Sequence, residues 1–214
     1  NRTNIKNKGI EEIYQNKGNI GYNDISNFTT NLTFSLIFAV LMAISANSFI
    51  YLPFTPIPIT TQVLTVLLSA LFLGSRWASI SQIIYILMGL MGLPVFSGFK
   101  NGITALPGPT GGYIIGFIAA AFVTGYIYEN SPKKNTSSII KLFFCLISCI
   151  AGVLLIHLFG FIHLFGYFYS ISGTNLVLDT LIKTWKLGTQ PFLAIDFLKI
   201  ISATIIVNLN KIKK

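Results

Sequence analysis

Long apolar runs separated by short polar connections dominate the chain from about residue 32 onwards. A helix needs about 20 mostly apolar residues to cross a bilayer. The pattern therefore predicts an all-α membrane protein with six transmembrane helices within residues 31–210. We expect these helices at Leu32–Tyr51, Thr61–Leu73, Ala78–Leu93, Gly112–Tyr128, Ile139–Phe165 and Pro191–Leu209.

The second and third apolar segments are short for a full span. They are separated by "LGSR", Leu73 to Arg76. We expect these two segments to be tilted, or broken at this point.

The two ends of the chain are polar. Residues 1–30 are rich in Asn, Lys and Gly and lack the apolar core and cleavage site of a signal peptide. We expect a mobile cytoplasmic tail there, and residues 211–214 form a basic C-terminal end.

Two connections have their own patterns. "GLPVFSGFKNGITALPGPTGGY" is dense in Gly and Pro, and irregular backbone near a membrane is tolerated only where protein buries it or it lines a polar cavity. This loop is therefore a site candidate. "NLVLDTLIKTWKLG" pairs Asp179 with Lys183 on a helical repeat, which is typical of a short amphipathic interface helix or of a plain connector.

Composition supports the membrane assignment. The chain is 53% hydrophobic and only 10% charged, whereas a soluble domain has about a quarter charged residues. The net charge of +9 does not indicate nucleic acid, because the basic residues are scattered and no basic and aromatic platform exists.

The distribution of basic residues predicts the orientation, since cytoplasmic connections carry an excess of Lys and Arg. With six spans, eleven basic residues fall on the side of the two termini, and three fall on the other side: Lys100, Lys183 and Lys186. Both termini are expected in the cytoplasm, and the Gly/Pro loop is expected outside.

Asp196 and Lys199 lie inside the last apolar segment, three residues apart and so on one helical face. Each charge costs roughly 2.5–3.5 kcal/mol to insert at mid-depth, and intramembrane charges usually mark a functional site. The alternative is a plain ion pair that offsets its own burial.

The cysteines and histidines of the apolar segments are expected to have packing or interface roles. Cys145 and Cys149 are four residues apart without a second pair to complete a zinc site. His157 and His163 match no metal spacing, so packing or interface roles are expected. No metal or cofactor is expected.

Four motifs, "PIPITTQ", "GLPVFSG", "GPTGGY" and "PFLAIDFLK", occur in order between the spans. With them the chain resembles the BioY family, the biotin-binding S components of energy-coupling factor (ECF) transporters. The resemblance implies a six-helix carrier in the plasma membrane, or in an organelle envelope. It would bind biotin from outside and work with a transmembrane coupling protein and two ATPase subunits.

Biotin has two ureido N–H donors, one carbonyl acceptor, an apolar ring and a carboxylate. Asp196 can accept from the ureido group, and Lys199 can neutralise Asp196 while donating to the ligand. The loop and the start of the fourth helix can hold the carboxylate, and tyrosines can wall the rings. The remaining candidates are Gly98, Asn101, Thr110, Gly111, Tyr113, Tyr85 and Gln62.

The first helix carries small residues at helical spacing: Ala39, Ala43 and Ala46. Small residues let membrane helices approach closely, so internal packing is one interpretation. The resemblance implies another, in which these alanines dock the coupling protein.

Two further functions stay open at this point: an S component for another vitamin, and a biotin facilitator that acts alone. A membrane-embedded enzyme is disfavoured, because the chain has no His-Glu-x-x-His, nucleophile elbow or phosphate loop. Energy from ATP would have to come from partners.

Overall fold

The computed structural model describes residues 26–132, 137–172 and 177–212. The chain divides into two compact units, Asn1–Phe34 and Ser35–Lys214. The described part of the first unit is the start of an N-terminal helix, Ser26–Asn47. Everything below concerns the second unit.

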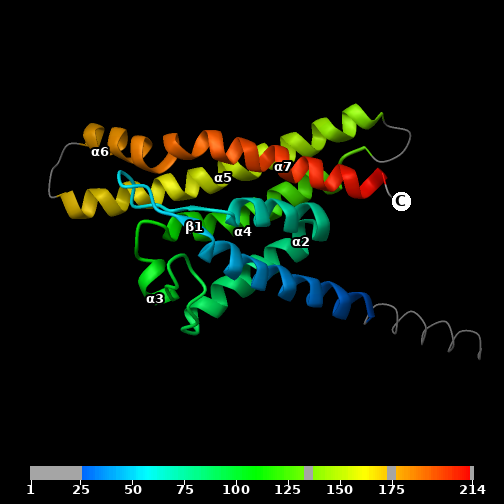
Figure 1. Cartoon of the computed structure of the whole chain (residues 1–214), viewed down its shortest axis with the longest axis horizontal. Coiled ribbons are helices and arrows are strands. Elements are labelled where there is room, and N and C mark those ends of the chain that lie inside the picture. The colour runs from blue at the N-terminus through cyan, green and yellow to red at the C-terminus, as the bar shows by residue number, and fades with distance from the viewer. Residues whose placement is uncertain (1–25, 133–136, 173–176, 213–214) are drawn as a thin grey trace, which may run out of the picture. The chain divides into compact units, whose positions relative to one another are not determined.

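Helices make up most of the second unit (Figure 1). A short antiparallel hairpin, with Phe49 opposite Thr60 and Ile50 opposite Ile59, follows the N-terminal helix. The elements are β1 (Phe49–Ile50), β2 (Ile59–Thr60), α2 (Gln62–Leu90), α3 (Gly102–Ala105), α4 (Gly111–Glu129), α5 (Ser138–Ser172), α6 (Val177–Thr184), the π-helical turn η1 (Trp185–Thr189), the 3-10 turn η2 (Gln190–Phe192) and α7 (Leu193–Ile212).

Five helical stretches of the described residues are long and apolar enough to cross a membrane. One of them is α2, which is broken at Gly74. The break lies in "LGSR", so the predicted interruption between the second and third segments is confirmed. Counting the two arms of α2 separately gives the six apolar segments of the sequence, and the all-α membrane fold is confirmed.

A glycine is needed at this break. Gly74 has φ 78° and ψ 176°, a conformation that is essentially restricted to glycine. A Cβ atom there would also overlap Oε1 of Glu129, which comes from the end of α4. The Ser75 hydroxyl donates to Oε2 of the same carboxylate at 2.7 Å, so the end of α4 is tied to the break in α2.

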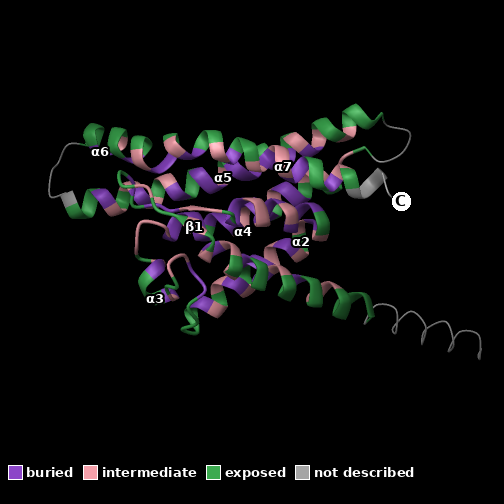
Figure 2. Cartoon of the chain, viewed as in Figure 1, coloured by how far each residue is buried: buried purple, intermediate pink, exposed green. Residues whose placement is uncertain are grey.

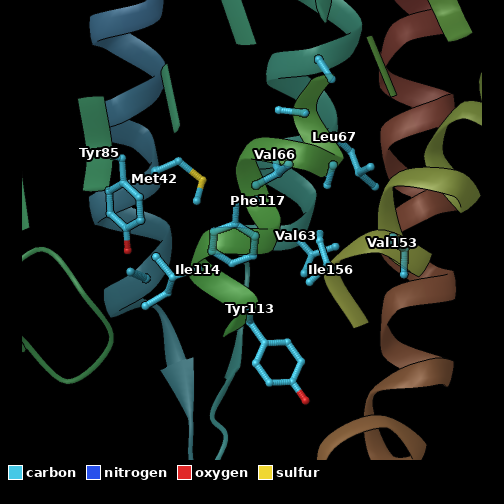
Figure 3. Packing of buried hydrophobic residues seen from close by; sticks show 14 of the residues in the cluster. Met42, Val63, Val66, Leu67, Tyr85, Tyr113, Ile114, Phe117, Val153 and Ile156 are labelled. Carbon is cyan, nitrogen blue, oxygen red and sulfur yellow. The ribbon is translucent and has the colours of Figure 1, made fainter. Parts of the chain in front are cut away.

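The most extensive packing in this unit is that of α4 against α5 and α2. Small residues on α4 allow the close approach. A Cβ atom at Gly112 would overlap the Phe159 carbonyl of α5, and one at Gly125 would overlap the Ser75 backbone of α2. Apolar side chains of α2, α4 and α5 meet in the core (Figure 3).

Exposed residues occur along all of the long helices (Figure 2), and many of them are large and apolar. On α5, for example, Leu154 and Ile162 are 63% and 62% exposed. Soluble monomers rarely expose large contiguous apolar patches. A lipid environment accounts for this surface.

The last helical stretch is longer than predicted. A helix does form at α6, but it continues through η1 and η2 into α7, and Val177–Leu209 is a single candidate span. Its predicted position at a membrane interface stays a prediction. The last span was expected to start at Pro191, but the helical stretch already includes α6 and η1 before that residue.

The N-terminal boundary also differs. The described residues are helical from Ser26 onwards, so the last five residues of the predicted 1–30 tail lie in the first helix. The rest of the predicted tail lies outside the described residues. At the other end, α7 extends to Ile212, two residues into the predicted basic end.

The alanines of the first helix lie mostly inside the fold. Ala39 and Ala46 are fully buried, and Ala43 is partly buried against the core. The internal-packing interpretation fits their burial. Docking of a coupling protein on these alanines stays a prediction.

Candidate functional site

A pocket of about 600 Å³, including solvent at its mouth, lies among the hairpin, α2, the Gly/Pro loop, α4, α5, η2 and α7. A largely apolar lining with a few polar groups is typical of small-molecule sites. The apolar lining residues are Ile57, Pro58, Val63, Ile114, Phe117, Ile156 and Phe192. The polar ones are Thr60, Gln62, Tyr85, Ser97, Thr110, Tyr113, His157, Asp196 and Lys199.

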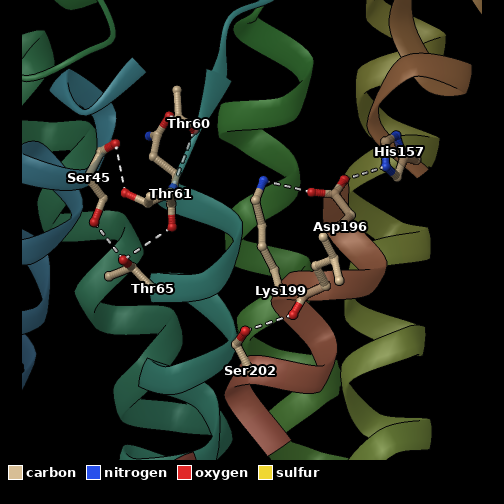
Figure 4. Close-up of polar contacts among 10 residues, drawn as sticks. Ser45, Thr60, Thr61, Thr65, His157, Asp196, Lys199 and Ser202 are labelled. Atoms are coloured by element: carbon tan, nitrogen blue, oxygen red, sulfur yellow. Dashed lines mark hydrogen bonds and ion pairs between the residues drawn. The ribbon is translucent and has the colours of Figure 1, made fainter. Parts of the chain in front are cut away.

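A charged cluster lies on one side of this pocket (Figure 4). Oδ1 of Asp196 accepts from Nζ of Lys199 at 2.8 Å, and Oδ2 accepts from Nε2 of His157 at 2.9 Å. The side chains of His157, Asp196 and Lys199 are 9%, 5% and 12% exposed. Asp196 is thus a buried carboxylate held between α5 and its own helix.

This cluster retains hydrogen-bonding capacity. An ionised carboxylate offers about four acceptor positions, and the two contacts described here use two of them. A lysine ammonium has three donors, of which one is directed to Asp196. The site can therefore accept from N–H groups and donate to a carbonyl at the same place.

His157 fixes the carboxylate from α5. The Nε2 atom of His157 donates to Asp196. The other ring nitrogen of His157, Nδ1, is buried and has no hydrogen-bond partner among the described residues. The rings of Tyr113 and His157 both line this side of the pocket. They meet edge to face, with 6.3 Å between the ring centroids.

A neutral hydrogen-bond chain forms another wall. The Thr60 hydroxyl donates to Oε1 of Gln62, whose Nε2 donates to the Tyr85 hydroxyl at 2.9 Å. The Tyr85 hydroxyl donates to the Val95 carbonyl of the loop at 3.3 Å. The fully buried Tyr85 ring also meets Phe96 edge to face, so it is held rigidly.

The π-helical turn η1 connects the pocket walls. The Tyr113 hydroxyl donates to the Gly188 carbonyl at 2.8 Å, and the Thr55 hydroxyl donates to the Leu187 carbonyl at 2.6 Å. A side chain at Gly188 would press on Leu164 and Tyr113. Single π turns frequently occur at functional sites, and this one immediately precedes η2 and Asp196.

The structure brings together six of the nine ligand-site residues expected from the sequence. The pocket is lined by Asp196, Lys199, Thr110, Tyr113, Tyr85 and Gln62.

The other three do not line this pocket, and their positions have local causes. Gly98 has φ 74° in the turn of the loop, and its Cβ position faces the Tyr51 hydroxyl. The Asn101 side chain accepts from the Thr104 N–H and so caps α3. The Gly111 N–H donates to the Gly108 carbonyl at 3.2 Å, so the free N–H group expected at this glycine is already used.

His157 is the main residue that the sequence did not assign to the site. It was expected to pack, yet it contacts Asp196 from a position 39 residues away in the chain. An available signal was its ionisable side chain inside an apolar span, since such groups in membranes usually pair with one another. His163 contacts the loop instead, at the Gly108 carbonyl.

The described residues contain no group of three or more His, Cys, Asp or Glu side chains that could hold a metal ion. Cys145 and Cys149 are both buried and are not joined by a disulfide. They lie on α5 away from the residues that line the pocket.

Several known proteins are similar to this chain. Residues 15–213 match the model of the BioY family. The biotin transporter BioY of Thermotoga maritima is 37% identical over 170 residues, which cover 79% of this chain and 89% of that protein. The biotin transporter BioY of Rhizobium etli is 31% identical over 180 residues, with 83% and 91% covered.

A solved structure is also similar. The crystal structure of the S-component for biotin from an ECF-type ABC transporter superposes with a TM-score of 0.69. The two chains are 26% identical, and the match covers 87% of this chain and 93% of the other.

Proposed function

This chain belongs to the BioY family, and from that premise we propose that it is the substrate-binding membrane subunit of a biotin transporter. The observation that carries the proposal is the buried Asp196, which keeps free acceptor positions beside the Lys199 donor in a largely apolar pocket. These acceptor and donor positions complement the two N–H groups and the carbonyl oxygen of the biotin ureido group.

The ureido group has two N–H donors and one carbonyl oxygen. The N–H groups bind the free acceptor positions of Asp196, and the carbonyl accepts from Lys199. Bonds to charged groups are shorter and about twice as strong as neutral ones. Because the side chains of Asp196 and Lys199 are nearly buried, the correct ligand satisfies hydrogen-bonding positions that would otherwise remain buried and unpaired.

The remaining walls suit the fused rings of biotin. Phe117, Ile156 and Phe192 supply apolar surface. The rings of Tyr85 and Tyr113 supply aromatic faces, while their hydroxyls are already bonded to Val95 and Gly188. The tyrosines therefore contribute shape and apolar contact more than hydrogen bonds to the ligand.

The transport cycle extends beyond this chain. We place the pocket mouth on the outer side of the plasma membrane, because the basic residues predict that side for the loop that borders it. Uptake would be driven by a transmembrane ECF coupling protein and two ATPase subunits, since the sequence has no ATP-binding motif. The ligand is biotin, and no cofactor takes part.

Uptake of labelled biotin tests the proposal. Cells that cannot transport biotin are given this chain alone, the coupling module alone, or both. We expect ATP-dependent uptake only when both are present. Uptake with the chain alone would identify a solitary facilitator. If the chain is shown to be in the membrane, an absence of uptake both with the chain alone and with chain and coupling module together would contradict the proposed function.

A further inference from the structure

His157 lines the pocket that contains Asp196, and the proposed function gives it no role. It is a buried histidine on α5, a helix that is long and apolar enough to cross a membrane. Ionisable side chains at such positions usually pair with one another and mark functional sites. The partner of His157 is Asp196 of α7, so their contact joins two helices at the residue proposed to bind the ureido group.

The bond to Asp196 is the one hydrogen bond of the His157 ring within the described part of the chain. Nε2 is the donor at 2.9 Å, because an ionised carboxylate can only accept. Nδ1 is buried and has no hydrogen-bond partner among the described residues. Among these residues, the ring therefore serves Asp196 and no other polar group.

Asp196 needs a partner from another helix to hold its carboxylate in one orientation. The torsion that rotates the carboxylate of an aspartate is broad, so the position on α7 does not set it. Lys199 is on the same helix, and its ammonium is a compact charge with rotatable donors on a flexible stem. The N–H of an imidazole instead has a direction fixed by its ring, and the carboxylate lies between the two partners (Figure 4).

The His157 ring is itself held in place. The Tyr113 ring of α4 meets it edge to face, and the Tyr113 hydroxyl donates to the Gly188 carbonyl at 2.8 Å. Gly160 lies one turn beyond His157 on α5, and a Cβ atom there would overlap the Tyr113 ring. The absence of a side chain at Gly160 thus lets Tyr113 pack directly on α5 beside His157.

These contacts determine where the free acceptor positions of Asp196 lie. Oδ2 is bonded to His157 and Oδ1 to Lys199, and each oxygen keeps one further acceptor position. We propose that His157 is a positioning residue for ligand binding. Its Nε2–H holds the Asp196 carboxylate so that the free positions face the ligand beside the Lys199 ammonium. This inference rests on the proposed function.

Two substitutions separate the N–H donor of His157 from its bulk. His157→Phe keeps a ring but has no donor, and we expect it to weaken biotin binding about three- to tenfold, the effect of losing one directed hydrogen bond. His157→Gln places an amide N–H at a similar reach, so it should recover most of the affinity. Equilibrium binding of biotin to the purified variants measures both effects.

A mutant cycle tests whether His157 acts through Asp196. In a background with Asp196→Ala and Lys199→Met, His157 has no carboxylate to hold, and no lysine is left without its anion. We expect His157→Phe to have no effect on biotin affinity in that background. Residues that act through one another are not additive, whereas a role in packing would give the same loss in both backgrounds.

Desthiobiotin gives a second readout, because it keeps the ureido ring but lacks the thioether ring. If His157 acts only on the ureido contact, His157→Phe should weaken desthiobiotin and biotin by the same factor. His163→Phe is the matched control on the same helix. His163 bonds to the Gly108 carbonyl at 2.9 Å and does not line the pocket, so any effect should be equal in both backgrounds.

Four results would overturn the positioning role: full affinity in His157→Phe, an equal loss in His157→Gln, an equal loss in both backgrounds, or a loss for biotin alone. If His157→Phe does not fold, His157→Met, which also lacks an N–H donor, takes its place. Failure of both to fold while His163→Phe folds would show a structural role instead. If folded wild type does not bind biotin, the proposed function fails first, and this result is distinct from the others.

Discussion

A carboxylate buried in a membrane helix needs partners, and Asp196 has two. Lys199 is on the same helix, so the sequence predicted this contact from the three-residue spacing. His157 comes from α5, and no local pattern records a contact between two helices. The sequence therefore predicted the charged pair but not the histidine that completes it.

Replacing Asp196 by asparagine should weaken biotin binding. The substitution keeps the size of the side chain but replaces a charged acceptor by a neutral amide whose donors face the ureido N–H groups. A hydrogen bond to a charged group contributes about 1.5–3 kcal/mol. We expect biotin affinity to fall by roughly ten- to a hundredfold or more, measured by equilibrium binding.

A second variant controls for the stranded lysine. Asp196→Asn leaves Lys199 without its anion, which destabilises the fold on its own account. Adding Lys199→Met removes that charge, and we expect this double variant to recover expression but not binding. Wild-type affinity in the double variant would show that the pair is structural and that the ureido group binds elsewhere.

At the scale of elements, apolar periodicity and length predicted the helices, because lipid contact and core packing both favour long apolar runs. The break in α2 was also predictable, since "LGSR" interrupts the run at Gly74. The two-residue strands β1 and β2 are too short to carry a period. The π turn η1 was missed because its causes are contacts with Thr55 and Tyr113, far away in the sequence.

The break in α2 at Gly74 should tolerate a side chain poorly. Gly74→Ala should lower the thermal unfolding temperature, because the new Cβ is strained at φ 78° and overlaps the Glu129 carboxylate. A residue held in such a region costs about 1–3 kcal/mol before the overlap is counted. Thermal unfolding in detergent measures the effect.

Gly92→Ala is the matched control. Gly92 also has a positive φ of 93°, but a Cβ there meets nothing within 4 Å. It therefore reports backbone strain without overlap, and we expect a smaller loss than for Gly74→Ala. Equal losses would show that the contact between the α2 break and Glu129 contributes little.

At the scale of the whole molecule, the pocket that contains Asp196 adjoins the Gly/Pro loop, while the α2 break adjoins the end of α4 at Glu129. These are opposite ends of α4, which runs from Gly111 to Glu129. The count of basic residues predicts that the loop end lies outside. The direction of capture depends on this orientation.

Cysteine labelling tests the orientation. In a background without Cys145 and Cys149, single cysteines at Lys100 and Lys186 should react with an impermeant reagent in intact cells. A cysteine at Asn130, which is exposed beyond the other end of α4, should react only after permeabilisation. The reverse pattern would move the pocket mouth to the cytoplasmic side.

The most direct test of the central claim is a titration of the purified wild-type chain with biotin, without ATP and without partner proteins. The account predicts saturable one-to-one binding with a dissociation constant in the nanomolar range, which corresponds to about 12 kcal/mol. It also predicts competition by molecules that keep the ureido ring. A folded protein that shows no saturable binding of biotin would contradict the claim that this pocket is a biotin site.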